Sequence, residues 1–390
     1  MMYKKLTILL LTLAMTCGCI NQFVPEFNEE NPFLVVEGMI TDQKEAYKIT
    51  VSWSYPLNSS EQYNPVNGFT VSVTDDAGNR YFFTEGGGGT YISDPEMFQG
   101  VPGRKYVLHL EGNSHIYESE AMELMPVPPV DSLYAGPEDN EFFHPGQVTR
   151  GYQVYADSRD PTGRCRFFRW EFEETWEFKI PWDYFKIVNR VCWKSAASDN
   201  INIKSTSAFS ESSVSKQPIH FISTETDRLM RKYSLLLKQY SLNEKEFIYW
   251  DNLRKTNEEV GGLYDIVPSS VSSNIICVDD PSNKVLGYFR VSSVATRRLF
   301  IEDVRMRFPD FYAYCPFDTL PVIDYDPYVH RNVYILREYS DVPPDVFYYI
   351  LSFKKECADC TLSGSGIKPD YWDQPEAQTI YHTLFDEKEK

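Results

Sequence analysis

Short apolar segments separated by turn residues recur throughout residues 33–124, and this spacing limits the first part of the chain to an all-β fold. Phe33–Thr41 and Tyr47–Ser54 are rich in β-branched residues, and Phe69–Thr74 alternates valine with polar side chains. A turn-forming Asp-Asp-Ala-Gly-Asn run follows that last segment. Roughly seven strands with such regular turns are typical of a β-sandwich. We therefore predict an N-terminal sandwich of the immunoglobulin or transthyretin type.

A proline-rich and acidic stretch, residues 125–147, follows the predicted sandwich. Three prolines between Met125 and Val130 disfavour both helix and sheet, so we expect a stiff linker here. The pattern of residues 148–390 remains β-rich, which predicts a larger second domain with few helices. The chain as a whole is therefore assigned to the mainly β class.

One helix is predicted inside the second domain, near residues 241–260. Ser241 and Glu244 have the spacing of a capping box, in which each side chain satisfies a free backbone N–H. Phe247, Trp250 and Leu253 then recur at the spacing of a buried helical stripe. We interpret that stripe as a packing face rather than a cofactor site.

The first 19 residues resemble an export signal. Two lysines precede an apolar run of the length of a signal core, and the run closes with small residues before a cysteine. That order is typical of a bacterial lipoprotein signal, with residues 1–18 removed and Cys19 lipidated. Cys17, which follows the bulkier Thr16, is the weaker choice, and a plain cleaved signal is the alternative.

An acylated Cys19 would hold the chain on a lipid bilayer. Stable anchoring requires more than one acyl chain, and bacterial lipoproteins carry diacylglycerol and an amide-linked chain such as palmitate. Residues 19–32 are polar with two prolines, which favours an extended tether. We expect an outer-membrane location, on either the periplasmic or the cell-surface face.

The charge of the chain argues against one class of partner. The formal net charge is −18 at pH 7, and such an acidic protein repels phosphate backbones. Nucleic-acid binding is therefore not expected. Aromatic residues make up 15% of the chain, which favours strands and a sheet core over a specialised ligand surface.

Six cysteines lie beyond Cys19, and in an exported protein they suggest disulfides with fifteen possible pairings. The last two form a C-x-x-C motif, for which redox chemistry and zinc binding are the alternatives. No second motif of this kind and no nearby histidine pair accompanies it. We predict structural disulfides among these cysteines: Cys165, Cys192, Cys277, Cys315, Cys357 and Cys360.

No catalytic motif stands out in the sequence. HExxH, GxSxG and P-loop patterns are absent, so no catalytic residue, metal site or cofactor is predicted. A glycosidase needs two carboxylates that flank the scissile bond, and four glutamates cluster on one predicted strand. Aspartate pairs could bind calcium, but turn formation explains them better. The glutamates are Glu171, Glu173, Glu174 and Glu177, and the aspartates are Asp279, Asp280, Asp324 and Asp326.

Several short motifs in this order resemble the Bacteroidota outer-membrane lipoproteins grouped as domain of unknown function 4249 (DUF4249). Leu34-Val35-Val36-Glu37-Gly38 follows the tether, and Leu286-Gly287-Tyr288-Phe289 follows the predicted helix. Cys192-Trp193 lies in the second domain, and the C-x-x-C motif precedes Lys368-Pro369-Asp370-Tyr371-Trp372. The expected double glycine after the last cysteine is replaced by Gly364-Ser365-Gly366. The resemblance implies no enzymatic activity and no ligand residues, and it implies TonB-dependent outer-membrane receptors as partners.

The sequence therefore favours a non-catalytic lipoprotein that is an accessory or ligand-capturing partner of a TonB-dependent uptake complex. The first alternative is a cell-envelope hydrolase acting on glycan or peptide. A structural or adhesion lipoprotein is the second alternative.

Overall fold

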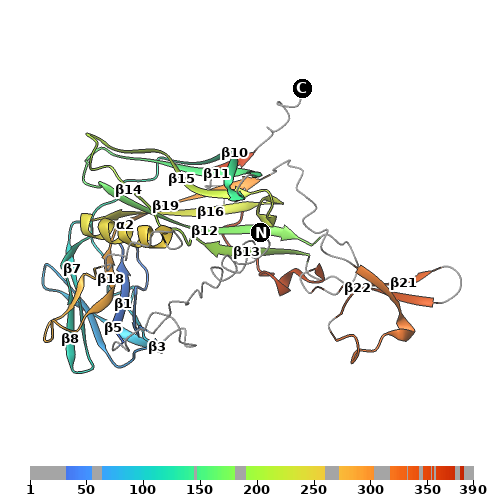
Figure 1. Ribbon diagram of the computed structural model, residues 1–390, viewed down its shortest axis with the longest axis horizontal. Helices are drawn as coiled ribbons and strands as arrows, with labels where there is room; N and C mark the ends of the chain where they lie inside the picture. Colours follow the sequence, from blue (N-terminus) through green and yellow to red (C-terminus); the bar gives the residue numbers. More distant parts are fainter. Residues whose placement is uncertain are drawn as a thin grey trace, which may run out of the picture.

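A computed structural model shows a mainly β protein (Figure 1). It describes residues 32–54, 64–144, 147–180, 190–259, 272–302, 317–331, 333–341, 346–352, 354, 357–373 and 378–381. The predicted fold class is confirmed. No helix among these residues has the length and apolar character needed to cross a membrane.

The N-terminal sandwich is built from one continuous sheet that folds over on itself. Strand β5 joins its two halves, because the first half of β5 pairs with β4 and the second half pairs with β6. Alternate residues of β1 and β7 point into the core of this domain. The N-terminal strands are β1 (Leu34–Ile40), β2 (Lys48–Trp53), β3 (Asn64–Pro65), β4 (Thr70–Asp75), β5 (Arg80–Gly87), β6 (Thr90–Ile92), β7 (Lys105–Gly112), β8 (His115–Ser119) and β9 (Met122–Glu123).

Two strands from much later in the chain complete this sheet, which corrects the predicted domain boundaries. Strand β17 (Ile275–Cys277) pairs with β8, and β18 (Val285–Val291) pairs in parallel with β1. Gly287 lies opposite Val36 with a φ of +89°, and a Cβ there would stand 2.1 Å from the Val36 carbonyl oxygen. Only glycine fits such a close approach. The sandwich therefore contains segments on both sides of the second domain.

The predicted linker is also partly wrong. Its second half forms β10 (Ser132–His144), which pairs with β11 (Gln147–Asp160), and β11 pairs in turn with β15 (Ser212–Ser223). The strand forms because Leu133 and Ala135 are buried in the core of the second domain. Between residues 125 and 130, side chains from other strands hydrogen-bond to backbone carbonyls, so this segment is held in place.

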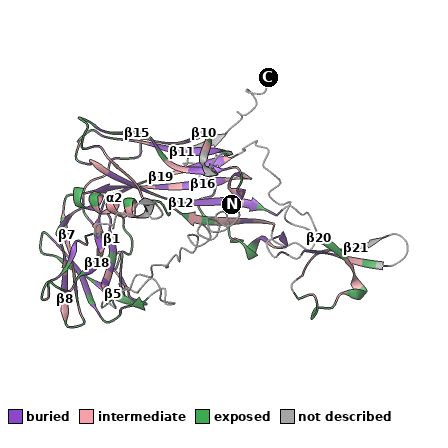
Figure 2. Cartoon of the chain, in the orientation of Figure 1, coloured by how far each residue is buried: buried purple, intermediate pink, exposed green. Residues whose placement is uncertain are grey.

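The larger sheet of the second domain has the order β13-β12-β16-β19-β23, with β14 also paired to β12. It packs with the β10-β11-β15 sheet, since buried residues of both form one core (Figures 1 and 2). Its strands are β12 (Phe167–Lys179), β13 (Val191–Ala197), β14 (Asn202–Ser205), β16 (Tyr233–Leu242), β19 (Val294–Glu302) and β23 (Gln378–Tyr381), and a short helix, η1 (Asp227–Leu229), precedes β16.

The predicted helix is present as α2 (Glu244–Glu259), but its cap differs from the prediction. Asn243 is the capping residue, because its Oδ1 accepts a hydrogen bond from the backbone N–H of Glu246. Ser241 belongs instead to strand β16, and its hydroxyl donates to the Met125 carbonyl. Strand β16 therefore continues almost to the cap, and Ser241, the predicted capping residue, hydrogen-bonds to the 125–130 segment instead.

A fourth, small sheet lies to one side of the other three (Figure 1). Its strands have the order β20-β22-β21 and pair with one another. They are β20 (Phe317–Pro321), β21 (Tyr334–Asp341) and β22 (Val346–Ser352), and the short helix η2 (Val322–Asp324) follows β20. A further short helix, η4 (Cys360–Leu362), carries the last cysteine.

Candidate functional site

The predicted lipidation site cannot be placed in this structure. Cys19, the signal over residues 1–18 and the tether up to residue 31 lie outside the described residues. The anchor therefore remains a prediction from sequence, and the candidate sites below come from the folded domains.

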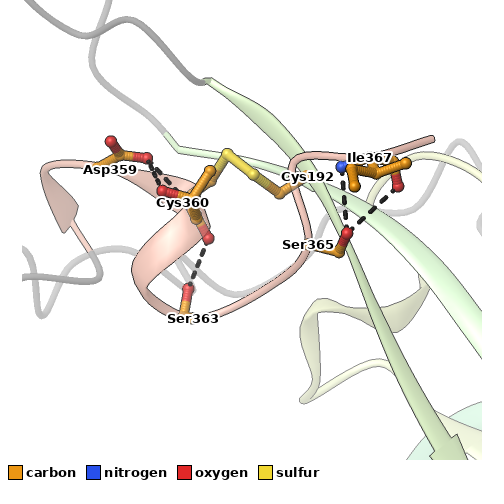
Figure 3. Close-up of a disulfide and its surroundings, with 7 residues drawn as sticks. Cys192, Asp359, Cys360, Ser363, Ser365 and Ile367 are labelled. Carbon is orange, nitrogen blue, oxygen red and sulfur yellow. Dashed lines mark hydrogen bonds between the residues drawn. A yellow bond between two sulfur atoms is a disulfide. The ribbon is translucent and has the colours of Figure 1, made fainter.

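The structure contains a disulfide between two of the predicted cysteines, whose pairing the sequence left open. Cys192 of β13 is bonded to Cys360 of η4, with 5.7 Å between their Cα atoms (Figure 3). Cys357 is disulfide-bonded as well. Because Cys360 is joined to Cys192, the C-x-x-C motif is not closed on itself as a redox disulfide would be. The bond fastens the C-terminal segment to the edge of the larger sheet, and Cys315 lies outside the described residues.

Two of the cysteines predicted to form disulfides are free thiols instead. Cys165 and Cys277 are both buried and unpaired. Cys165 is part of the core of the second domain, whereas Cys277 is part of the core of the sandwich. The two thiols cannot form a disulfide with each other because they occupy different cores.

The four glutamates of β12 do not share one face of the sheet. Side chains alternate along a strand, so Glu174 points to the core face while Glu171, Glu173 and Glu177 point to the outer face. Glu173 is exposed and forms an ion pair with Lys238. Glu173 and Glu174 therefore cannot act together on one bond.

Glu174 is the centre of a buried polar cluster, the core-face cluster, formed with Arg228, Tyr233, His220 and Trp176. Arg228 donates from Nε and NH2 to the carboxylate at 2.7 to 3.0 Å, and the Tyr233 hydroxyl donates at 2.9 Å. The His220 ring nitrogen lies 3.3 Å away, without hydrogen-bond geometry. The guanidinium of Arg228 also stacks on Trp176 at 4.4 Å.

The hydrogen bonds of this cluster fix the charge of Glu174. Burial alone would raise the pKa of this carboxyl, but the contacts with His220 and Arg228 outweigh burial and lower the pKa to about 2. A carboxyl that stays ionised at neutral pH does not serve as a general acid. The core-face cluster is therefore a structural ion pair.

A second buried cluster, the junction cluster, lies on the outer face of β12 where the two domains meet. It consists of Arg169 and Glu171 of β12, Arg290 of β18, and Glu246 and Trp250 of α2. Arg169 lies 3.6 Å and Arg290 lies 5.5 Å from the centre of the Trp250 ring system. Both guanidinium groups form their ion pairs with Glu171. One tryptophan thus holds cations from both domains.

Glu246 is the most strongly perturbed acid of the junction cluster. Its side chain is buried, and its contacts are long: Trp250 Nε1 donates at 3.4 Å and the Ser292 hydroxyl at 3.5 Å. Burial raises the pKa of this carboxyl to about 7, although Arg290 and Arg169 oppose the shift. Burial also lowers the pKa of Arg169 to about 10. This cluster can therefore take up a proton near neutral pH.

The sequence analysis identified Trp250 as a packing residue and missed the charges around it. Charged residues next to apolar ones could have indicated this cluster. Arg169 lies between Phe168 and Trp170, and Glu246 precedes Phe247. Within the described residues, Arg169 Nε and the Tyr288 hydroxyl are buried without a hydrogen-bond partner. Buried polar groups of this kind are costly, so the domain junction loses stability at these two atoms.

Two of the four aspartates considered for calcium, Asp280 and Asp326, form turns. Asp280 accepts hydrogen bonds from the Ser282 N–H and hydroxyl, and Asp326 accepts one from the Tyr328 N–H. Asp279 differs, because it contacts His115 and Cys277, two side chains of the kinds that bind transition metals.

Comparison with known proteins identifies one family. The family described as "Domain of unknown function (DUF4249)" matches residues 20–298 of the 390 in the chain. The matched region contains the sandwich, strands β17 and β18, and most of the larger sheet. No curated protein matches the chain.

Proposed function

The chain belongs to the DUF4249 family, and on that premise we propose that it is a non-catalytic, outer-membrane lipoprotein of a Bacteroidota cell. In this proposal the folded domains serve as an accessory or ligand-capturing partner of a TonB-dependent receptor. The observation that carries the proposal is the lipoprotein-type signal that ends at Cys19, followed by a polar tether.

A second observation supports a protein partner. Three apolar side chains are largely exposed in the segment between β20 and β21: Ile323 is 90% exposed, Tyr328 87% and Val329 72%. Neighbouring exposed apolar residues of this kind are typical of interaction surfaces. The segment connects two strands of the small sheet that lies to one side of the other three sheets (Figure 1).

The anchor is tested by changing the two candidate cysteines separately. Cys19→Ser removes the atom that carries the lipid, so the protein should move from the membrane pellet to the soluble fraction. Cys17→Ser is the matched control and should stay in the pellet. Mass spectrometry of the N-terminal peptide distinguishes processed from unprocessed chains. A processed Cys19→Ser protein that remains in the pellet would overturn the anchor.

The partner is tested by affinity purification of the tagged full chain from detergent-solubilised membranes. A TonB-dependent receptor should copurify with it. The triple variant Ile323→Ser, Tyr328→Ser, Val329→Ser should recover at least about tenfold less receptor if these residues are contact residues. Phe209→Ser, which changes a residue that is 62% exposed elsewhere, is the control. Recovery of the lipoprotein without any receptor would contradict the proposal.

A further inference from the structure

Three side chains with different metal-binding atoms meet at the edge of the sandwich. The ligand atoms of His115, Cys277 and Asp279 all lie within 4.8 Å of one another. His115 Nδ1 is 2.8 Å from Asp279 Oδ2, and the Cys277 thiol donates to Asp279 Oδ1 at 3.4 Å. Cys277 is buried, while His115 is partly exposed and Asp279 is exposed, so solvent reaches the cluster from one side.

The sheet brings these residues together from distant parts of the chain. Asn113 and Ser114 have positive φ angles of 52° and 65°, which form the tight turn that places His115 at the start of β8. Cys277 lies opposite Tyr117 in the β17–β8 pair. Asp279 follows Cys277 by two residues, and its Oδ1 accepts a hydrogen bond from the Ile116 N–H at 2.8 Å. Backbone pairing therefore fixes both sides of the cluster.

We propose that His115, Cys277 and Asp279 bind one divalent transition-metal ion of the zinc class, with a fourth position open to solvent. Zinc takes sulfur, nitrogen and carboxylate ligands at about 2.0 to 2.3 Å in a tetrahedron, which places neighbouring ligand atoms about 3.3 to 3.6 Å apart. The Asp279 carboxylate lies 3.4 Å from the Cys277 sulfur through Oδ1 and 2.8 Å from His115 Nδ1 through Oδ2. Because all three ligand atoms lie within 4.8 Å of one another, side-chain adjustments of about 1 to 2 Å would bring them to tetrahedral spacing.

The donor set also selects the type of ion. Calcium and magnesium prefer six or more oxygen ligands, whereas a thiol and an imidazole favour zinc and similar ions. The Ile116 N–H occupies Oδ1 of Asp279 and leaves Oδ2 directed at His115. A backbone donor that orients a metal-binding carboxylate in this way is a common feature of protein metal sites.

Binding at this cluster has a defined proton balance. The pKa of Asp279 is lowered to about 2, chiefly by the Ile116 N–H and His115, so this ligand is already ionised. Burial raises the pKa of the Cys277 thiol, so the ion must displace the thiol proton when the sulfur–metal bond forms.

The other free cysteine provides a matched control. Cys165 is buried like Cys277, but its sulfur contacts the carbonyl oxygen of Phe167, and it is not part of the cluster of potential ligands. Both cysteines are unpaired, so a general effect of a free thiol would be the same for the two.

The experiment uses the full chain in detergent, treated with a chelator and then titrated with Zn²⁺ and with Co²⁺. We expect one tightly bound ion per chain and, with Co²⁺, a sulfur-to-metal charge-transfer band. Cys277→Ser should abolish the band and weaken Zn²⁺ binding at least about 100-fold, whereas Cys165→Ser should bind like the parent. Equal behaviour of the two variants, or a parent that binds no Zn²⁺, would overturn the proposal.

Two variants at exposed or partly exposed residues test the site without the risk that replacing the buried Cys277 disrupts folding. His115→Gln and Asp279→Asn change exposed or partly exposed side chains, and circular dichroism verifies their fold. Each should weaken Zn²⁺ binding by at least about tenfold. If both folded variants keep the parent affinity, the ion binds elsewhere and the site is wrong.

Discussion

Glu174 and Glu246 are both buried carboxylates that lie close to arginines, yet their pKa values are shifted in opposite directions. Glu174 receives two-pronged donation from Arg228 and a tyrosine hydroxyl, and its pKa is lowered to about 2. Glu246 receives only two long hydrogen bonds, and its pKa is raised to about 7. The two residues are almost equally buried, since Glu174 is 2% exposed and Glu246 is 1% exposed.

The difference shows that burial alone does not determine charge in this protein. Short hydrogen bonds to an ionised carboxylate stabilise the charged form, whereas burial without them favours the neutral form. The arginines near Glu246 face Glu171 and Trp250 instead, so they compensate for its burial only in part. The charge of Glu174 is therefore fully compensated within the core-face cluster. The junction cluster instead contains a carboxyl, Glu246, that can change its protonation near neutral pH.

Removing Arg228 should give the largest effect. Arg228→Met leaves the Glu174 charge buried without its two-pronged partner, so the free energy of unfolding should fall by about 3 to 5 kcal/mol at pH 7. The stabilisation from ionised Glu174 is present above pH 4.5 and is lost as the pH falls toward 2. The difference between parent and variant should therefore shrink on acidification. Urea unfolding at pH 7 and pH 3 measures both.

Lys238→Met is the matched control for that variant. Lys238 pairs with Glu173 on the outer face of the same strand, where both side chains are partly exposed. Its removal should cost no more than about 1 kcal/mol. If the two variants lose equal stability, the distinction between the buried and the surface pair fails.

Neutralising Glu246 should give the next largest effect, with the opposite dependence on pH. Because its pKa in the folded state, about 7, exceeds the ordinary value of 4.5, the folded protein holds the extra proton between these values. The stabilisation is complete below pH 4.5 and is lost as the pH rises through 7. Glu246→Gln should therefore match the parent near pH 5 and exceed it by up to about 3 kcal/mol at pH 8.

Urea unfolding of both proteins at pH 5, 6, 7 and 8 tests this expectation. Glu173→Gln changes an exposed carboxylate on β12, and its difference from the parent should stay within about 1 kcal/mol throughout. Parallel curves for the parent and Glu246→Gln would show that the buried acid is ionised over the whole range, which would remove the contrast with Glu174.

Local patterns predicted the elements of this fold better than their partners. The strand that carries the four glutamates and the helix near residues 241–260 follow from patterns of neighbouring residues, and both elements are present as β12 and α2. The pairing of β18 with β1 joins segments about 250 residues apart, as the register of Leu34 with Val285 shows. Periodicity carries no information on such a partner. For the same reason the acidic linker was not recognised as strand β10.

The junction cluster and the disulfide pairing could not be predicted from the sequence for a related reason. A charge in an apolar strand, such as Arg169, has no visible partner in the sequence, because Arg290 and Trp250 lie on other elements. The disulfide could be proposed only as one of several pairings until the structure joined Cys192 to Cys360. The sequence thus showed which residue types were present, but the strand order determines which of them contact one another.

Weakening the aromatic contact of the junction cluster should give the smallest effect. Trp250→Phe reduces the ring that holds both guanidinium groups, so the free energy of unfolding should fall by about 1 to 2 kcal/mol. The variant also removes the long hydrogen bond from Nε1 to Glu246, so a single substitution does not isolate the cation–π contact.

A double-mutant cycle with Arg169→Met separates the two contributions. If the stacking at 3.6 Å stabilises the junction, the two substitutions should be coupled by about 1 kcal/mol in urea unfolding at pH 7. Leu299→Val, a buried change in the other core, should add to Arg169→Met without coupling. A cycle energy below about 0.3 kcal/mol would mean that Trp250 fills space at the junction without holding its charges.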